Sequence, residues 1–188
     1  QIGNRNKDLS SENIVVTPSV NLVDLIWTNQ PPIPQKKVFI HHMKYSGESS
    51  SNKRSHIKKI LKENKIDAIL ISSPENLCWT FNLRGSDVPM TPIAFGYAII
   101  DNKGNAKLFF HKNKLNGQVR TALTQDKTLS INDISEFLEQ IKHLAGKKIW
   151  LDSQTANVEV LRVAEAVQVS THISTDPIYL MKAKKNAV

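Results

Sequence analysis

The sequence is short of cysteine, of acidic residues and of long apolar runs, and each shortage excludes a class of protein. A single cysteine in 188 residues excludes a disulfide scaffold and any metal site built from cysteines alone. No apolar run approaches the roughly 18–20 residues that cross a bilayer, so we expect no membrane partner. The first dozen residues lack the apolar core of a signal peptide, and we expect none. These features predict a protein of a reducing compartment, the cytoplasm.

The deficit of acidic residues leaves a formal charge of +8, from 25 Lys and Arg against 17 Asp and Glu. An excess of this sign fits a nucleic-acid partner. One predicted helix carries a basic cluster: Arg54, Lys58, Lys59, Lys62 and Lys65. We favour a solvated helix face, because no aromatic residues interleave with these side chains to stack on bases. Nucleic acid is thus not expected as a partner, and a stand-alone nucleic-acid-binding domain is the alternative function.

Short apolar runs alternate with amphipathic stretches, which predicts an α/β domain with a mixed β-sheet flanked by helices. The expected strands, rich in Val, Ile and Phe, are Asn13–Thr17, Lys37–His41, Asp67–Ser72, Phe95–Asp101, Ala106–Phe110, Lys127–Ile131, Lys148–Asp152 and Gln168–Ile173. The expected helices are Ser50–Asn64, Lys112–Leu123, Asp133–Ala145 and Thr155–Val167. Asp101–Asn105 predicts a hairpin turn. Three prolines in Thr28–Lys36 favour an extended segment.

Residues with catalytic or metal-binding chemistry are sparse. Glu136, Glu139 and His143 share a helical face with ligand spacing, but that face is also the polar side of an amphipathic helix. A two-metal nuclease would need gathered carboxylates, for which the strand-end residues would be Asp67, Asp101 and Asp152. Turns and caps place aspartate at the same positions. With no zinc, phosphate-loop or nucleophile-elbow motif present, we predict no catalytic, metal or cofactor-binding residue.

The densest unusual stretch runs from Trp79 to Pro89. A helix beginning near Pro74 would turn Leu77, Cys78 and Phe81 inward, with Cys78 a buried apolar residue, and would end near residue 82. Beyond it, Arg84 and Asp87 are spaced for a local ion pair, and Asn82 and Ser86 for hydrogen bonds to the turn. Spacing alone leaves two interpretations open. The loop either only holds itself together or is presented to a ligand or another domain.

The same stretch carries a family resemblance. Trp79–Asp87, W-T-F-N-L-R-G-S-D, resembles the signature W-L-x-N-L-R-G-x-D of three-domain aminopeptidase P, the Xaa-Pro aminopeptidases. The signature leucine is Thr80 here, and Gln30 replaces the arginine that commonly precedes the family's first proline. Further stretches agree in order: Asn21–Trp27, the prolines at 31, 32 and 34, Tyr45–Gly47, Pro92–Ile100, Trp150–Asp152 and Lys182–Asn186.

This resemblance implies the middle domain of such an enzyme, with the ribonuclease-H-like α/β fold of creatinase and prolidase N-terminal domains. Residues 1–12 would be a lead-in, 13–181 the domain and 182–188 the start of the link to the catalytic domain. The parent enzyme would remove the residue that precedes proline from a peptide substrate. A pita-bread domain absent from this chain would hold its two divalent metals, usually manganese. The expected partners are the other two domains and, in a homodimer, a second parent chain.

Within such a parent, the resemblance implies a non-catalytic role that scaffolds and walls the active-site cleft. We expect the loop containing Asn82, Arg84 and Asp87, with Trp79 beside it, to lie nearest the cleft or the seam between domains. Arg84 would orient a carbonyl or carboxylate, and Asp87 would hold Arg84. A third hypothesis, a complete small hydrolase, predicts turnover of an Xaa-Pro peptide with added manganese, and we expect none.

Overall fold

The computed structural model of the chain describes residue 17 and residues 19–187. Contacts divide the chain into two units, residues 1–34 and 35–188, which are considered separately. In the first unit, helix α2 (Leu22–Ile26) begins where the Asn21 side chain accepts the Val23 amide at 3.1 Å. The predicted strand Asn13–Thr17 and the lead-in 1–12 lie outside the described residues, apart from Thr17.

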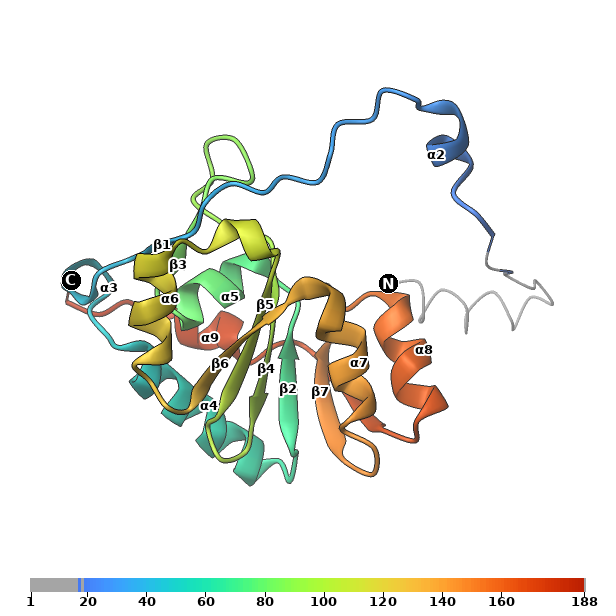
Figure 1. Cartoon of the computed structure of the whole chain (residues 1–188). Coiled ribbons are helices and arrows are strands. Elements are labelled where there is room, and N and C mark those ends of the chain that lie inside the picture. The colour runs from blue at the N-terminus through green and yellow to red at the C-terminus, as the bar shows by residue number, and fades with distance from the viewer. Residues whose placement is uncertain (1–16, 18, 188) are drawn as a thin grey trace. The chain divides into compact units, whose positions relative to one another are not determined.

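The second unit is built on a six-stranded sheet in the order β6-β5-β4-β2-β7-β8 (Figure 1). Strand β2 pairs antiparallel with β4 and parallel with β7, β4 pairs antiparallel with β5, and the outer pairs β5–β6 and β7–β8 are parallel. The predicted mixed sheet is therefore confirmed. The strand bounds are β2 Ala68–Ile71, β4 Tyr97–Asp101, β5 Ala106–Phe110, β6 Leu129–Asp133, β7 Lys148–Asp152 and β8 Ser170–Ser174.

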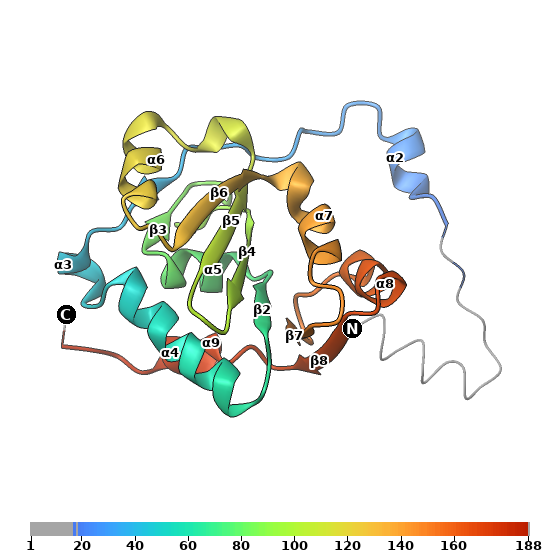
Figure 2. The ribbon, with the colours of Figure 1, turned by 60° about the horizontal axis from the view of Figure 1, so that its bottom comes forward.

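Both faces of the sheet are covered, so the domain has two cores. Successive residues of a strand point to opposite faces. Ile69 and Ile71 accordingly join the core under α4 (Ser50–Glu63), α5 (Pro74–Thr80), α6 (Gly117–Thr124) and α9 (Ile178–Ala183). Ala68 and Leu70 join the core under α7 (Phe137–Lys142) and α8 (Val158–Ala166). Figure 2 shows α4 and α9 on one side of the sheet and α7 and α8 on the other.

Two predicted helices are shorter than expected because side-chain caps start them late. Asn116 caps α6 by accepting the Val119 amide at 2.9 Å, leaving only the 3₁₀ turn Lys112–Lys114 before it. Asn157 likewise caps α8 at the Val160 amide. The predicted helix Asp133–Ala145 is shorter as well. Asp133 ends β6 and caps the 3₁₀ helix Ile134–Glu136 through a capping box with Glu136, and the α-helix that follows ends at Lys142.

The predicted strand Lys37–His41 is wrong in extent and in place. Only β1 (Phe39–Ile40) is a strand, and it pairs antiparallel with β3 (Leu83–Arg84) in a separate two-stranded sheet. Phe39 is half exposed, which fits a strand outside the main core. The run Lys127–Ile131 is shifted to β6, since Asp126 accepts the Thr128 amide and hydroxyl in a turn at the strand's start.

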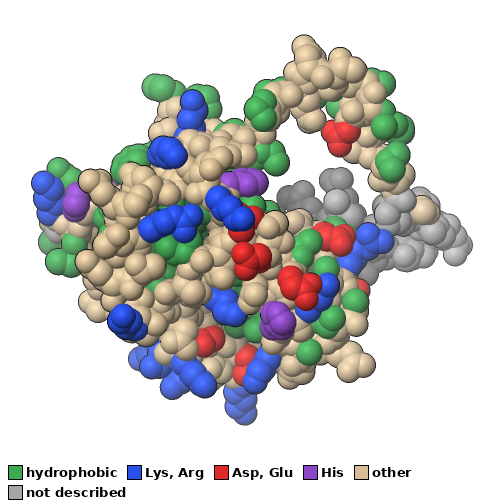
Figure 3. Space-filling model, viewed as in Figure 1, with side chains coloured by type: hydrophobic (Ala, Val, Ile, Leu, Met, Phe, Trp, Pro, Cys, Tyr) green, Lys and Arg blue, Asp and Glu red, His purple; other side chains and the backbone are tan. Residues whose placement is uncertain are grey.

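The basic cluster on α4 does not form a single stripe, because Arg54 is buried. Its guanidinium donates to the Gly104 carbonyl at 2.7 Å and to the Thr128 hydroxyl at 2.8 Å, and pairs with Asp126. Burial acts to raise the pKa of Asp126, yet the Thr128 and Arg54 hydrogen bonds hold that pKa below its usual value. Figure 3 shows Lys and Arg side chains dispersed over one face, with acidic side chains among them.

The carboxylates considered for metal binding hold backbone and neighbouring side chains instead. Asp67 accepts the Lys148 amide, Asp101 accepts two amides of the predicted hairpin turn, and Asp152 accepts the Thr155 hydroxyl. Glu139 pairs with Lys142. Within the described residues, no group of three or more His, Cys, Asp or Glu can hold a metal ion, which overturns both candidate sets. Nor is any helix there long and apolar enough to span a membrane.

Candidate interdomain surface around the 82–87 loop

Helix α5 starts and ends as its sequence predicts. Ser73 caps its first turn, Pro74 begins it, and Leu77, Cys78 and Phe81 are buried. Burial raises the pKa of the Cys78 thiol, so the cysteine is an apolar core group and no nucleophile.

Asn82 follows the helix in a left-handed conformation, with φ of 51°. Asparagine tolerates this region better than most residues and often ends a helix there. Its amide nitrogen donates to the Glu48 carbonyl at 2.8 Å, and its own carbonyl accepts the His41 amide at 2.8 Å. Asn82 therefore fixes two neighbouring segments rather than its own turn.

Lys53 of α4 completes this anchor. Its ammonium donates to the side-chain oxygen of Asn82 at 2.7 Å and to the Trp79 carbonyl at 2.9 Å. The ammonium also lies 4.2 Å from the centre of the Trp79 ring, within cation–π range. Burial and the nearby Arg84 charge lower the Lys53 pKa to about 8, against an opposing effect of Glu48.

The predicted ion pair between Arg84 and Asp87 is wrong. Asp87 is buried and pairs with the fully buried Lys114, and it also accepts the Lys36 amide at 3.0 Å and the Phe95 amide at 2.6 Å. Arg84 turns the other way and donates from Nη1 to the carbonyls of Leu83 at 2.8 Å and Cys78 at 3.5 Å. Asp87 thus anchors the loop while Arg84 stays partly exposed.

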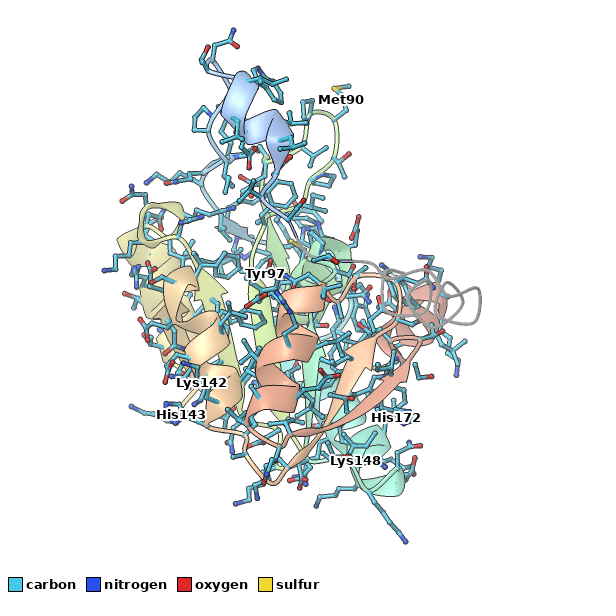
Figure 4. All side chains as sticks on the ribbon, turned by 90° about the vertical axis from the view of Figure 1, so that its right-hand side faces the viewer. Met90, Tyr97, Lys142, His143, Lys148 and His172 are labelled. Carbon is cyan, nitrogen blue, oxygen red and sulfur yellow. The ribbon has the colours of Figure 1, made fainter. Side chains whose placement is uncertain are left out.

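Beyond Asp87 the chain forms a narrow tip. Val88 and Thr91 form an isolated bridge, and Met90 between them has a φ of 60° and is fully exposed. In Figure 4 Met90 lies at one end of the unit, and Lys142 and His143 lie toward the other. The tip therefore stands on a fixed base and exposes the Met90 side chain to solvent.

Three stretches that carry the family resemblance meet at one pocket of about 150 Å³. Trp79 and Arg84 come from the signature, Tyr45 and Ser46 from the Y-S-G stretch, and three lysines with Asn186 from the C-terminal stretch. The Asn186 side chain donates to the Ser46 carbonyl at 2.9 Å and lies against Gly47, whose φ is 69°. Figure 1 shows the C-terminal end beside α3 (Met43–Ser46).

The pocket is strongly basic. Besides Arg84 it is lined by Lys53, Lys182, Lys184 and Lys185, with His41, and by no carboxylate. Burial lowers the pKa of His41, and the charges of Arg84 and Lys53 lower it further. Burial likewise lowers the pKa of Lys182, with the Lys185 charge adding to the effect against the carboxylates of Glu75 and Asp176.

A polar network behind the pocket holds α9 against α5. Lys182 donates to the Asn76 side-chain oxygen at 2.8 Å, and the Asn76 amide donates to Asp176 at 2.8 Å. Burial raises the pKa of Asp176. The network therefore holds Lys182, the first of the three C-terminal lysines of the pocket, in place.

A larger pocket, of about 280 Å³, lies by the hairpin at residues 101–105. Its two carboxylates, Asp67 and Asp101, are the ones that hold backbone amides. Its described lining does not bring together a set of side chains suited to catalysis or metal binding.

The family model for the creatinase/prolidase N-terminal domain matches residues 29–188. The chain belongs to this family. A curated relative from Coprinopsis cinerea, named Probable Xaa-Pro aminopeptidase P, is 31% identical over 196 residues, covering 97% of this chain and 31% of the relative. One of the same name from Aspergillus clavatus is 39% identical over 175 residues, covering 88% of this chain and 26% of the relative. The domain thus spans about a third or less of the curated relatives' length.

Solved structures show the same fold. The X-prolyl aminopeptidase of Caenorhabditis elegans, called a cytosolic enzyme with a di-nuclear active site, matches with a TM-score of 0.86 at 24% identity, over 99% of this chain and 31% of that chain. The Xaa-Pro dipeptidase of Bacillus anthracis matches with a TM-score of 0.53 at 18% identity, over 74% of this chain and 37% of that chain. The predicted creatinase-type α/β fold is confirmed.

Sequence reasoning missed Lys53, Lys114 and Glu48. A usable signal existed for Lys53, which precedes the buried Ile57 by one helical turn and so lies on the buried face of α4. For Lys114 no local signal existed, because its partner Asp87 is 27 residues away.

Proposed function

We propose that this domain is the non-catalytic middle domain of a metal-dependent Xaa-Pro aminopeptidase. In this proposal it scaffolds the enzyme and walls the active-site cleft, with the 82–87 loop nearest the cleft or the seam between domains. The parent would hold two divalent metals, manganese by expectation, in a separate catalytic domain. Residues 1–12 would be a lead-in and 182–188 the start of the link to that domain.

The observation that carries the proposal is the meeting of three motif stretches at one pocket. A loop that merely closed the fold would need its buried anchors, Asn82 and Asp87, but it would not need a partly exposed Arg84 in a pocket shared with two other motif stretches. The chain length of the relatives supports a multi-domain setting, since this domain matches only part of each.

Location and assembly follow from the same proposal. We expect a cytoplasmic enzyme, in line with the cytosolic relative from Caenorhabditis elegans, and a homodimeric parent.

The alternative, a nucleic-acid-binding domain, has less support. In the basic cluster of α4, Arg54 is buried in the core, and none of the other cluster lysines lines the pocket that contains Tyr45 and Trp79. Binding to DNA or RNA at about 50 mM salt with a steep salt dependence would favour it over our proposal.

Two activity measurements test the proposal. The domain alone, given manganese and an Xaa-Pro peptide, should show no turnover, because its described residues contain no metal-ligand cluster. In the parent enzyme, Arg84→Ala should lower kcat/KM by roughly tenfold, the effect of losing one charge-assisted hydrogen bond.

The matched control is Lys62→Ala, which removes one exposed charge from α4 outside the pocket. A parent whose kinetics and melting temperature are unchanged by Arg84→Ala would contradict the role given to the loop.

A further inference from the structure

The cations of the basic pocket form no direct ion pair with a described carboxylate, although the charges of Glu48, Glu75 and Asp176 act on Lys53 and Lys182 from beyond ion-pair distance. Lys53 and Lys182 donate to neutral oxygens of Asn82 and Asn76, and Lys185 donates to a backbone carbonyl. Among the residues that the structure describes, none of the pocket's Lys or Arg side chains lies within ion-pair distance of a carboxylate. Several positive charges are therefore held together by a fixed backbone, and an anion would relieve their repulsion.

Arg84 presents the best-shaped donor. Its Nη1 is occupied by the carbonyls of Leu83 and Cys78, which fixes the plane of the guanidinium. No hydrogen bond to the described residues uses the edge formed by Nε and Nη2. That edge carries two parallel N–H groups, the arrangement that pairs with the two oxygens of a carboxylate.

The pocket's size limits its occupant. At about 150 Å³ it is smaller than the roughly 300–1,000 Å³ of pockets that enclose drug-sized ligands. It has room for a side-chain-sized anion flanked by the rings of Tyr45 and Trp79.

We propose that this pocket binds the carboxylate of a Glu or Asp side chain from an acidic peptide segment, with Arg84 as the paired donor and Lys185 as a second cation. This goes beyond the proposed function, because every residue that lines the pocket belongs to this chain and binding there needs no catalytic activity. Its failure would leave the proposed function standing.

The test uses the 188-residue chain and two neutral-ended peptides, acetyl-Ala-Glu-Ala-amide and acetyl-Ala-Gln-Ala-amide, followed by NMR at low salt. The Glu peptide should shift the Trp79 indole and Arg84 Nε signals with a dissociation constant of about 1–10 mM, in the range of one weak contact. The Gln peptide should shift neither. Raising the salt to about 0.5 M should weaken binding, because the contact is ionic.

Substitutions inside and outside the pocket show where the peptide binds. Arg84→Gln and Lys185→Gln should each weaken binding by about fivefold or more, whereas Lys62→Gln should change it less than twofold. Lys62 lies nine residues along α4 from Lys53, about 13 Å by helix rise and beyond the Debye length of about 8 Å. The two pocket variants are independent, so loss of folding in one leaves the other to decide.

Four results would overturn the proposal. They are equal binding of the two peptides, no shift up to about 10 mM of the Glu peptide, equal weakening by Lys62→Gln, and tighter binding of inorganic phosphate than of the Glu peptide at the same signals. The last would assign the pocket to phosphate.

Discussion

At the scale of single residues, the loop depends on two buried polar groups that reach distant parts of the chain. Asp87 pairs with Lys114 and accepts hydrogen bonds from the Lys36 and Phe95 amides. The side chain of Asn82 donates to the Glu48 carbonyl, and its backbone carbonyl accepts the His41 amide. Buried charges of this kind are stable only with every partner in place. The loop's rigidity therefore comes from contacts outside it.

Removing the charge of Asp87 should unfold the loop's base. Asp87→Asn leaves Lys114 buried without a counter-charge, a loss of about 3–5 kcal/mol in the free energy of unfolding. Urea denaturation of the chain measures it. The control is Glu139→Gln in the exposed pair with Lys142, which should leave the urea midpoint unchanged. Equal midpoints for the two variants would show that the Asp87 pair does not anchor the loop.

Lys53 should make stability depend on alkaline pH. Its pKa is about 8 in the folded protein, lowered from 10.5 by burial and by Arg84. Between these two values the unfolded chain binds more protons at this site, so the free energy of unfolding rises with pH. Relative to Lys53→Met, the wild-type protein should gain stability from about pH 8 to pH 10.5. Urea midpoints that keep a constant gap across this range would contradict the buried ammonium.

The local sequence predicts the structural roles of some of these residues but not of others. The positive φ of Asn82 fits an asparagine placed directly after a helix. Helical spacing places Lys53 and Arg54 on the buried face with Ile57, although charge alone suggests a solvated position. The error over Arg84 and Asp87 has a different cause. Their spacing is compatible with a pair, but a stronger partner for Asp87 comes from a segment that the local sequence does not reveal.

At the scale of elements, Gly47 at the end of α3 lets the C-terminal segment pack closely against that helix. Gly47 ends α3 in a left-handed conformation, and a Cβ at this position would clash with the Asn186 side chain. Short elements such as α3, β3 and α9 leave too little periodic pattern to predict them. Longer elements are easier to predict. Helix α4 buries a repeating face, and the central strand β2 is a continuous apolar run that is buried at all its positions.

Gly47→Ala should both strain α3 and displace the C-terminal segment. The left-handed backbone costs an alanine about 1–2 kcal/mol, and Asn186 must move away, losing its bond to Ser46. Gly146→Ala is the matched control, because Gly146 has a similar φ of 72° and open space around it. Both should lose stability in urea, but only Gly47→Ala should speed hydrogen exchange at residues 182–187. Equal exchange there in both variants would argue against the contact.

At the scale of the whole molecule, the domain is a closed two-core unit with one basic, motif-rich surface. The mixed character of the sheet follows from the alternation of runs along the sequence, but the strand order β6-β5-β4-β2-β7-β8 does not, because strand pairing is set by non-local contacts. The same holds for the pocket, whose lining comes from segments as far apart as residues 41 and 186. The family resemblance identifies these motifs in the sequence, but only the fold shows that they line one pocket.

The measurement that tests the account most directly is amide hydrogen exchange at residues 83–94, compared between this chain and the proposed parent enzyme. If the loop lies at a seam between domains, its exposed tip around Met90 should exchange at least about tenfold more slowly in the parent, as burial at an interface protects amides. Amides of the exposed hairpin at residues 102–105 serve as the internal reference and should not change. Equal exchange of the tip in both proteins would contradict the central claim that this surface faces another domain.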